Sequence, residues 1–135
     1  MAAEAFFDTS VLIYLLAAND SRTGIAQSLL AGGGVISVQV LNEFAAVARR
    51  KTQMSWEQIE QALADIRILC EAPVGLTTEI HEAGLSLAEP YGFHVYDALI
   101  VASALYAGCK VLYSEDMQDG QIIGSLTIQN PFRTK

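Results

Sequence analysis

Short apolar segments alternate with longer helix-like segments along the whole chain, and this alternation restricts the fold more than any other feature. Strands that are separated by helices need long crossover connections, which favour a parallel sheet covered by helices. We therefore predict an α/β fold with a central, mainly parallel sheet of four to five strands between two helical layers. The expected strands are residues 5–7, 35–37, 74–76 and 110–113, with residues 126–129 as an additional edge strand.

The segments between the expected strands carry residues that start and end helices. Ser55 and Gln58 have the spacing of a capping box, three glycines follow residue 31, and Pro90 and Gly108 each close an apolar segment. The first helix is apolar on nearly all sides, so we expect it to be buried. The predicted helices cover residues 10–17, 21–30, 40–51, 55–69, 78–89 and 97–107.

The size and composition predict a single domain over residues 1–135. The chain is 52% apolar and can bury a sizeable core, yet its longest apolar run, residues 11–18, is too short to span a bilayer. The first residues lack the basic segment of a signal peptide, and Cys70 and Cys109 have no metal-ligand spacing. We therefore expect a cytoplasmic protein with two buried, reduced thiols.

The net charge of −7 argues against a basic nucleic-acid-binding surface, but not against binding phosphate through metal ions.

Two acidic residues lie just past the carboxyl ends of expected strands. Asp8 ends the apolar run at residues 5–7, and Asp116 lies just past the strand at 110–113. Open α/β sheets build their binding sites at the carboxyl ends of strands, so both positions suit a functional site. Each residue also has a simpler explanation, because Asp8 could cap the next helix and Asp116 could be a surface turn residue.

Two further acids lie on the apolar faces of expected helices. Glu43 falls within the stripe formed by Val40, Phe44 and Val47, where a solvated glutamate is not expected. Asp97 begins the apolar face of its own helix. The alternatives are a Glu43 side chain that reaches solvent at the edge of the stripe and an Asp97 that caps its helix. Carboxylates in apolar surroundings need a positive partner, for which a divalent metal ion is the obvious candidate.

The segments around these acids, taken in order, resemble the four acidic motifs of PIN-domain nucleases. Within that family, the chain length and the ending Asn130-Pro131-Phe132 are most similar to VapC-type toxins of bacterial toxin–antitoxin pairs. The resemblance covers nearly the whole chain and implies a PIN-like three-layer α/β/α sandwich. The matching segments are Phe6-Phe7-Asp8-Thr9-Ser10-Val11-Leu12, Val40-Leu41-Asn42-Glu43-Phe44, Tyr96-Asp97-Ala98-Leu99-Ile100-Val101-Ala102-Ser103-Ala104 and Leu112-Tyr113-Ser114-Glu115-Asp116-Met117-Gln118-Asp119-Gly120.

This resemblance implies an endoribonuclease that uses Mg²⁺ or Mn²⁺ to hydrolyse RNA phosphodiester bonds. The implied catalytic and metal-binding residues are the quartet Asp8, Glu43, Asp97 and Asp116. Ser10 would be the small hydroxyl residue beside the first acid, Ser114 would replace a threonine that is common in the fourth motif, and Asp119 would be an auxiliary acid.

The expected partners follow from the resemblance and from the apolar residues of the first helices. The resemblance implies an RNA substrate, a cognate antitoxin and a second copy of the chain. Residues 11–30 offer more apolar side chains than one side of a small sheet can cover, so we expect part of them in a homodimer interface. We expect no membrane partner. Arg49, Arg50 and Lys51 could contact the substrate backbone, although a basic helix end is commonly just solvated.

Two other classes of function stay open at this point. A phosphoryl-transfer protein of similar topology needs a second acid near the end of the first strand and a lysine after a later strand. Here residues 8–10 are Asp-Thr-Ser, and no lysine occurs between Lys51 and Lys110. A non-enzymatic binding module, whose acids are caps and surface charges, would show no saturable stabilisation by Mg²⁺ or Mn²⁺.

Overall fold

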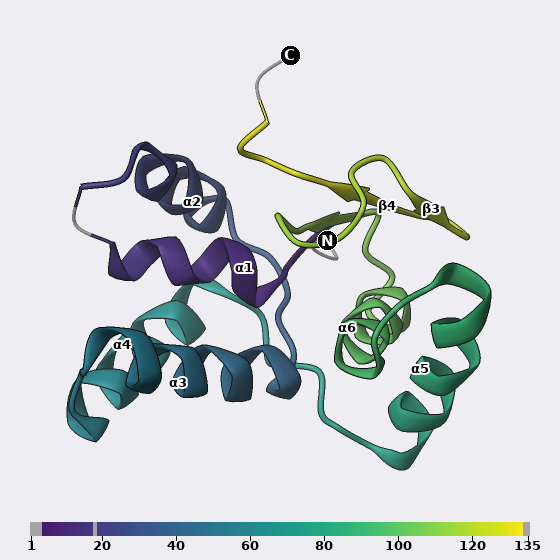
Figure 1. The fold of residues 1–135 in the computed structure, drawn as a ribbon, viewed down its shortest axis with the longest axis horizontal. Coiled ribbons are helices and arrows are strands. Elements are labelled where there is room, and N and C mark those ends of the chain that lie inside the picture. The colour runs from purple at the N-terminus through teal and green to yellow at the C-terminus, as the bar shows by residue number, and fades with distance from the viewer. Residues whose placement is uncertain (1–3, 18, 134–135) are drawn as a thin grey trace.

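The computed structural model describes residues 4–17 and 19–133, in which helices surround a four-stranded sheet (Figure 1). β1 pairs in parallel with β2, and β2 with β4, while β3 is antiparallel to β4. The predicted α/β class and mainly parallel sheet are therefore confirmed. The strands are β1 (Ala5–Phe7), β2 (Val111–Tyr113), β3 (Ile122–Ile123) and β4 (Leu126–Gln129), in the spatial order β1-β2-β4-β3.

Most helices begin at a side chain that caps their first turn. Asp20, Ser37, Ser55 and Thr77 each accept a hydrogen bond from a backbone N–H of the helix that follows, and the predicted capping box of Ser55 is present. None of the helices in the described part of the chain is long and apolar enough to cross a bilayer. The helices are α1 (Thr9–Leu12), the 3-10 helix η1 (Ile13–Leu16), α2 (Ser21–Ala31), α3 (Val38–Thr52), α4 (Trp56–Leu69), α5 (Thr78–Tyr91) and α6 (Val95–Tyr106).

Three of the expected strands differ from the prediction. Residues 126–129 form an inner strand between β2 and β3, so their predicted place at the edge was wrong. Residues 35–37 and 74–76 form only isolated bridges, from Phe6 to Val35 and from Ser37 to Val74. The reason is local, because Ser37 already caps α3 by accepting a hydrogen bond from the Val40 N–H. The chain therefore turns into a helix before a ladder can extend.

The helix boundaries also need corrections. The first helix starts at Thr9 and tightens into η1, whose residues are half-buried rather than fully buried as predicted. α5 continues past Pro90 to Tyr91 and ends at Gly92, whose φ of 72° lies in the left-handed region. α6 starts two residues before the predicted Asp97, because the chain enters the helix at His94.

The core joins the sheet to α3 and α6. Phe6, Leu112 and Ile128 from three adjacent strands are fully buried, and every residue from 98 to 104 of α6 is buried as well. α6 packs against α5 and α3, so its first turn is held on a rigid element. Cys109 is buried as predicted, whereas Cys70 is half-buried.

A glycine beside β1 gives a direct test of this packing. A Cβ at Gly34 would lie 2.5 Å from Cε2 of the buried Phe7 ring and 2.9 Å from the Ala5 carbonyl oxygen. Gly34→Ala should therefore lower the free energy of unfolding by about 1–3 kcal/mol, the usual cost of overpacking. Gly24→Ala is the matched control, because nothing lies within 4 Å of its added Cβ and alanine favours the helix by up to about 1 kcal/mol. Urea unfolding measures both; equal midpoints for the two variants would contradict the packing described.

Candidate active site

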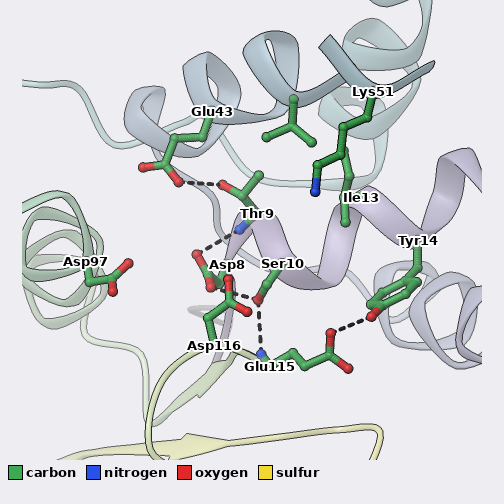
Figure 2. A pocket seen from close by; sticks show the side chains of 11 residues that line it. Asp8, Thr9, Ser10, Ile13, Tyr14, Glu43, Lys51, Asp97, Glu115 and Asp116 are labelled. Carbon is green, nitrogen blue, oxygen red and sulfur yellow. Dashed lines mark hydrogen bonds between the residues drawn. The ribbon is translucent and has the colours of Figure 1, made fainter. Parts of the chain in front are cut away.

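The four predicted acids all line one pocket of about 270 Å³ (Figure 2). They come from four separate elements, namely the end of β1, α3, α6 and the loop after β2. The alternation of strands and helices thus brings together residues that are more than 100 positions apart in the sequence. The lining residues are Asp8, Thr9, Ser10, Ile13, Tyr14, Glu43, Val47, Lys51, Asp97, Glu115 and Asp116.

Asp8 anchors the pocket through hydrogen bonds to both of its carboxylate oxygens. Its side chain is buried, and Oδ1 accepts a hydrogen bond of 2.8 Å from the Thr9 N–H. Oδ2 accepts hydrogen bonds of 2.8 Å from the hydroxyls of Ser10 and of Ser114. Asp8 is therefore the cap of α1, as the simpler explanation proposed, and also part of the pocket. The two roles do not exclude each other.

The two serines connect Asp8 to the loop after β2 by hydrogen bonds. Ser10 Oγ accepts a hydrogen bond of 3.0 Å from the Glu115 N–H. Ser114 Oγ accepts from the N–H groups of Asp116 and Met117, both at 3.2 Å. Since each hydroxyl oxygen already accepts a backbone N–H, its proton is free to point at Asp8. The backbone that carries Asp116 is thus tied to the end of β1.

Glu43 is held by two donors on the opposite wall. Gln39 Nε2 donates to Glu43 Oε2 at 2.7 Å, and the Thr9 hydroxyl donates to Oε1 at 3.3 Å. Glu43 is half-buried and lies on the pocket side of α3 together with Val47. Its position on the apolar stripe therefore reflects a place in the pocket.

Asp97 and Asp116 complete the acidic wall from more open positions. Asp97 is the third residue of α6 and half-buried, and it is not the helix cap, because His94 occupies that place. Asp116 is exposed on the loop after β2. In Figure 2 the Asp97 carboxylate points toward the pocket from the helix at the left, and the Asp116 carboxylate from the loop below it.

Burial and mutual repulsion raise the pKa of two of these acids. Desolvation raises the pKa of Asp8 to about 6; the hydrogen bonds from Ser10 and Ser114 oppose the rise, and the charges of Asp97 and Asp116 add to it. Burial also raises the pKa of Asp97, reinforced by the charges of Glu43 and Asp116 and opposed by His94. The quartet is therefore electrostatically coupled and favours a positive ligand.

A hard divalent cation fits the chemistry of this pocket. Its candidate ligands are all carboxylate and hydroxyl oxygens, which Mg²⁺ and Mn²⁺ prefer. Within residues 4–17 and 19–133, no three acidic, histidine or cysteine side chains are placed to hold an ion as they stand. Mg²⁺, however, commonly takes only one or two carboxylates and completes its shell with water and phosphate oxygens. The residues therefore fit an ion that keeps part of its water.

Three residues expected to assist the site lie outside the pocket lining. Asp119 accepts a hydrogen bond of 2.8 Å from the Asn130 N–H and pairs with Arg133, so it fixes the C-terminal segment. Arg49 donates to the Met54 carbonyl at 2.7 Å, and its guanidinium lies over the Trp56 ring. Arg50 is exposed and does not line the pocket.

The structure also places residues beside the pocket-lining acids that were not among the predicted site residues. Gln39 stands four residues before Glu43, a spacing that permits the observed hydrogen bond and could have indicated it. The hydroxyl of Tyr14 donates to Glu115, which also pairs with Arg22 at 3.3 Å. No local pattern indicates this second cluster, because its members come from η1, α2 and the loop after β2.

A comparison with models of known domain families identifies the family of the chain. The family model of the PIN domain matches residues 5–118, so the chain belongs to the PIN-domain family. Among curated protein sequences, none matches the chain.

Several solved structures share the fold. One is VapC20 of Mycobacterium tuberculosis, described as a sarcin–ricin loop cleaving toxin, with a TM-score of 0.67 and 23% identity over 83% of this chain and 89% of that chain. A toxin–antitoxin complex from Klebsiella pneumoniae has a TM-score of 0.72 and 20% identity over 96% of this chain and 99% of that chain. VapBC2 from Rickettsia felis, bound to a promoter DNA fragment, has a TM-score of 0.67 and 19% identity over 93% and 97% of the two chains. These structural neighbours are toxins of toxin–antitoxin systems, and at such identities the likeness shows a shared fold.

The raised pKa of Asp8 predicts how stability depends on pH in the presence of chelator. A carboxyl with a pKa of about 6 when folded and 3.8 when unfolded binds more protons in the folded state between these values. Its contribution to stability is present below about pH 4 and is lost as the pH rises through 6, a change of about 3 kcal/mol.

Unfolding of wild type and Asp8→Asn, compared from pH 4 to pH 7, isolates this contribution. The variant lacks the titrating group, so the wild type should lose stability relative to it as the pH rises. A constant offset between the two proteins across this range would show that Asp8 has an ordinary pKa.

Proposed function

We propose that this protein is a Mg²⁺- or Mn²⁺-dependent endoribonuclease and acts as the toxin of a type II toxin–antitoxin system. The observation that carries the proposal is the convergence of Asp8, Glu43, Asp97 and Asp116, from four separate elements, on one pocket. A structural role would explain each acid singly, but it would not place four of them around a shared space with two raised pKa values.

The acidic pocket cannot take a phosphodiester without a cation. The substrate phosphate is negative, and a pocket lined by carboxylates repels it. Asp8, Glu43, Asp97 and Asp116 would hold the ion, with Asp8 as the fixed point because its orientation is set by three hydrogen bonds. When bound, Mg²⁺ or Mn²⁺ supplies positive charge that draws the phosphate in, lowers the pKa of a water molecule and stabilises the leaving oxygen.

The protein residues keep this arrangement in place during hydrolysis. The reaction joins a water oxygen to phosphorus and breaks the bond to the 3′ oxygen, so the substrate 2′-hydroxyl takes no part. Gln39 and Thr9 hold Glu43 on one wall, while Ser10 and Ser114 hold the Asp116 loop on the other. The choice of RNA rests on the family resemblance and on the toxins that share the fold.

The proposed partners are a cognate antitoxin and a second copy of the chain, in the cytoplasm. Two of the structural neighbours were solved as toxin–antitoxin assemblies. An apolar groove of about 280 Å³ runs between η1, α2, α3 and α4, and Ile68 and Leu69 are exposed on α4. Such surface supports burial against other chains. The groove is lined by Leu15, Leu16, Gln27, Leu30, Phe44, Ala62, Asp65, Ile66 and Leu69.

Glu43→Gln is the sharpest test of the nuclease, because it removes charge and keeps the hydrogen bonds. The glutamine oxygen can still accept from Gln39, and its amide can donate to the Thr9 hydroxyl. Cleavage of RNA in Mn²⁺ should fall at least about 100-fold, since even residues that only support metal ligands typically contribute 10- to 100-fold.

Glu60→Gln is the matched control, an exposed glutamate on α4 that does not line the pocket. Its cleavage rate should equal that of the wild type. Equal rates for Glu43→Gln and the wild type would remove Glu43 from the site, and a wild type that cleaves no RNA with either metal would refute the proposed function.

A further inference from the structure

Lys51 is a cation at one end of the acidic pocket. Among the described residues that line the pocket, Lys51 alone carries a positive charge, and none of the ion pairs within residues 4–17 and 19–133 includes it. Its side chain runs from α3 toward Ile13 (Figure 2). The pocket thus combines four predicted acids with one lysine, which lies toward one of its ends.

Lys51 continues the pocket-facing stripe of α3. Glu43, Val47 and Lys51 follow one another at intervals of four residues, so they share one face of the helix. Eight residues along a helix correspond to about 12 Å between the Cα atoms of Glu43 and Lys51. The lysine is therefore displaced along the pocket from the acids, toward the end that Ile13 and Val47 line.

The other groups near this end are already engaged. The guanidinium of Arg22 lies 4.4 Å from the centroid of the Tyr14 ring and pairs with Asp20 and Glu115. The Phe132 ring meets Tyr14 edge-on, at 4.9 Å between centroids. Tyr14 and Arg22 thus have their main interaction surfaces occupied within the protein, whereas Lys51 and the apolar pair Ile13 and Val47 still face the pocket.

We propose that Lys51, Ile13 and Val47 form a subsite for the nucleotide next to the scissile phosphate. The Lys51 ammonium contacts the flanking phosphate, and Ile13 and Val47 pack against the ribose or base. This proposal rests on the proposed nuclease function and deepens it. With the scissile phosphate at the acids, a single-stranded substrate that continues along the pocket reaches Lys51. Among the described lining residues, this side chain alone can neutralise the next phosphate charge.

The test compares Lys51→Gln with the wild type in cleavage of a short single-stranded RNA in Mn²⁺ at several salt concentrations. KM should rise several-fold while kcat changes little, because the lost contact is made equally in the ground and transition states. The slope of log(1/KM) against log[salt] should become shallower by about 0.7, the value for one phosphate contact on a single strand.

Two further variants make the result specific. Lys51→Arg keeps the charge and should retain the salt slope of the wild type. Arg67→Gln removes another exposed cation, from the last turn of α4 and outside the pocket lining, and should leave both KM and the slope unchanged.

The other outcomes overturn the proposal in distinguishable ways. If Lys51 is instead a counter-ion for the acids, Lys51→Gln will alter Mn²⁺ affinity and stability in chelator, with the salt slope unchanged. If the wild type cleaves RNA and Lys51→Gln has the same KM and slope, the subsite is refuted and the nuclease stands. A wild type that cleaves no RNA refutes both.

Discussion

The hydrogen bonds to the buried Asp8 carboxylate are the interaction on which the site depends. Through Ser10 and Ser114 they join the end of β1 to the loop after β2, and through the Thr9 N–H they start α1. β1 and β2 are neighbours in the sheet, so this connection costs little extra ordering. The position of Asp116 is in this way a consequence of the position of Asp8.

The burial that orders the site also disfavours the ionised form of its carboxylates when no cation is bound. Desolvation is the main cause of the raised pKa of both Asp8 and Asp97, and the neighbouring carboxylates add to it. The hydrogen bonds from Ser10 and Ser114 lower the cost for Asp8 but do not cancel it. A bound divalent ion would offset both the desolvation of the carboxylates and their mutual repulsion. Binding of the metal ion that the proposed function needs should therefore also stabilise the folded protein.

The class of fold was predicted from a pattern with a physical cause, the alternation of strands and helices, whereas the grouping of the four acids came from the resemblance to PIN-domain nucleases; the structure places all four around one pocket. The place of Glu43 on the apolar stripe of its helix was the clearest signal from the residues themselves, since a glutamate on a core-facing stripe needs a partner. The prediction of strands at residues 35–37 and 74–76 was wrong, because apolar composition does not show where a helix cap such as Ser37 will end a strand. The contact of Tyr14 with Glu115 depends on tertiary packing, which no local pattern encodes. The place of Lys51 differs in this respect, because its spacing of four and eight residues from Val47 and Glu43 already puts it on their face of α3.

The central claim is that the four acids act together as one divalent metal site, and thermal unfolding during a Mn²⁺ titration tests it most directly. A ligand that binds only the folded state raises stability by RT ln(1 + [L]/Kd), so the wild-type melting temperature should rise and follow a saturable curve. Asp97→Asn should weaken or abolish that rise, while its melting temperature in chelator should not fall, because a coupled negative charge has been removed. A wild-type melting temperature that does not respond to Mn²⁺ or Mg²⁺, or a response that Asp97→Asn shares in full, would contradict the account.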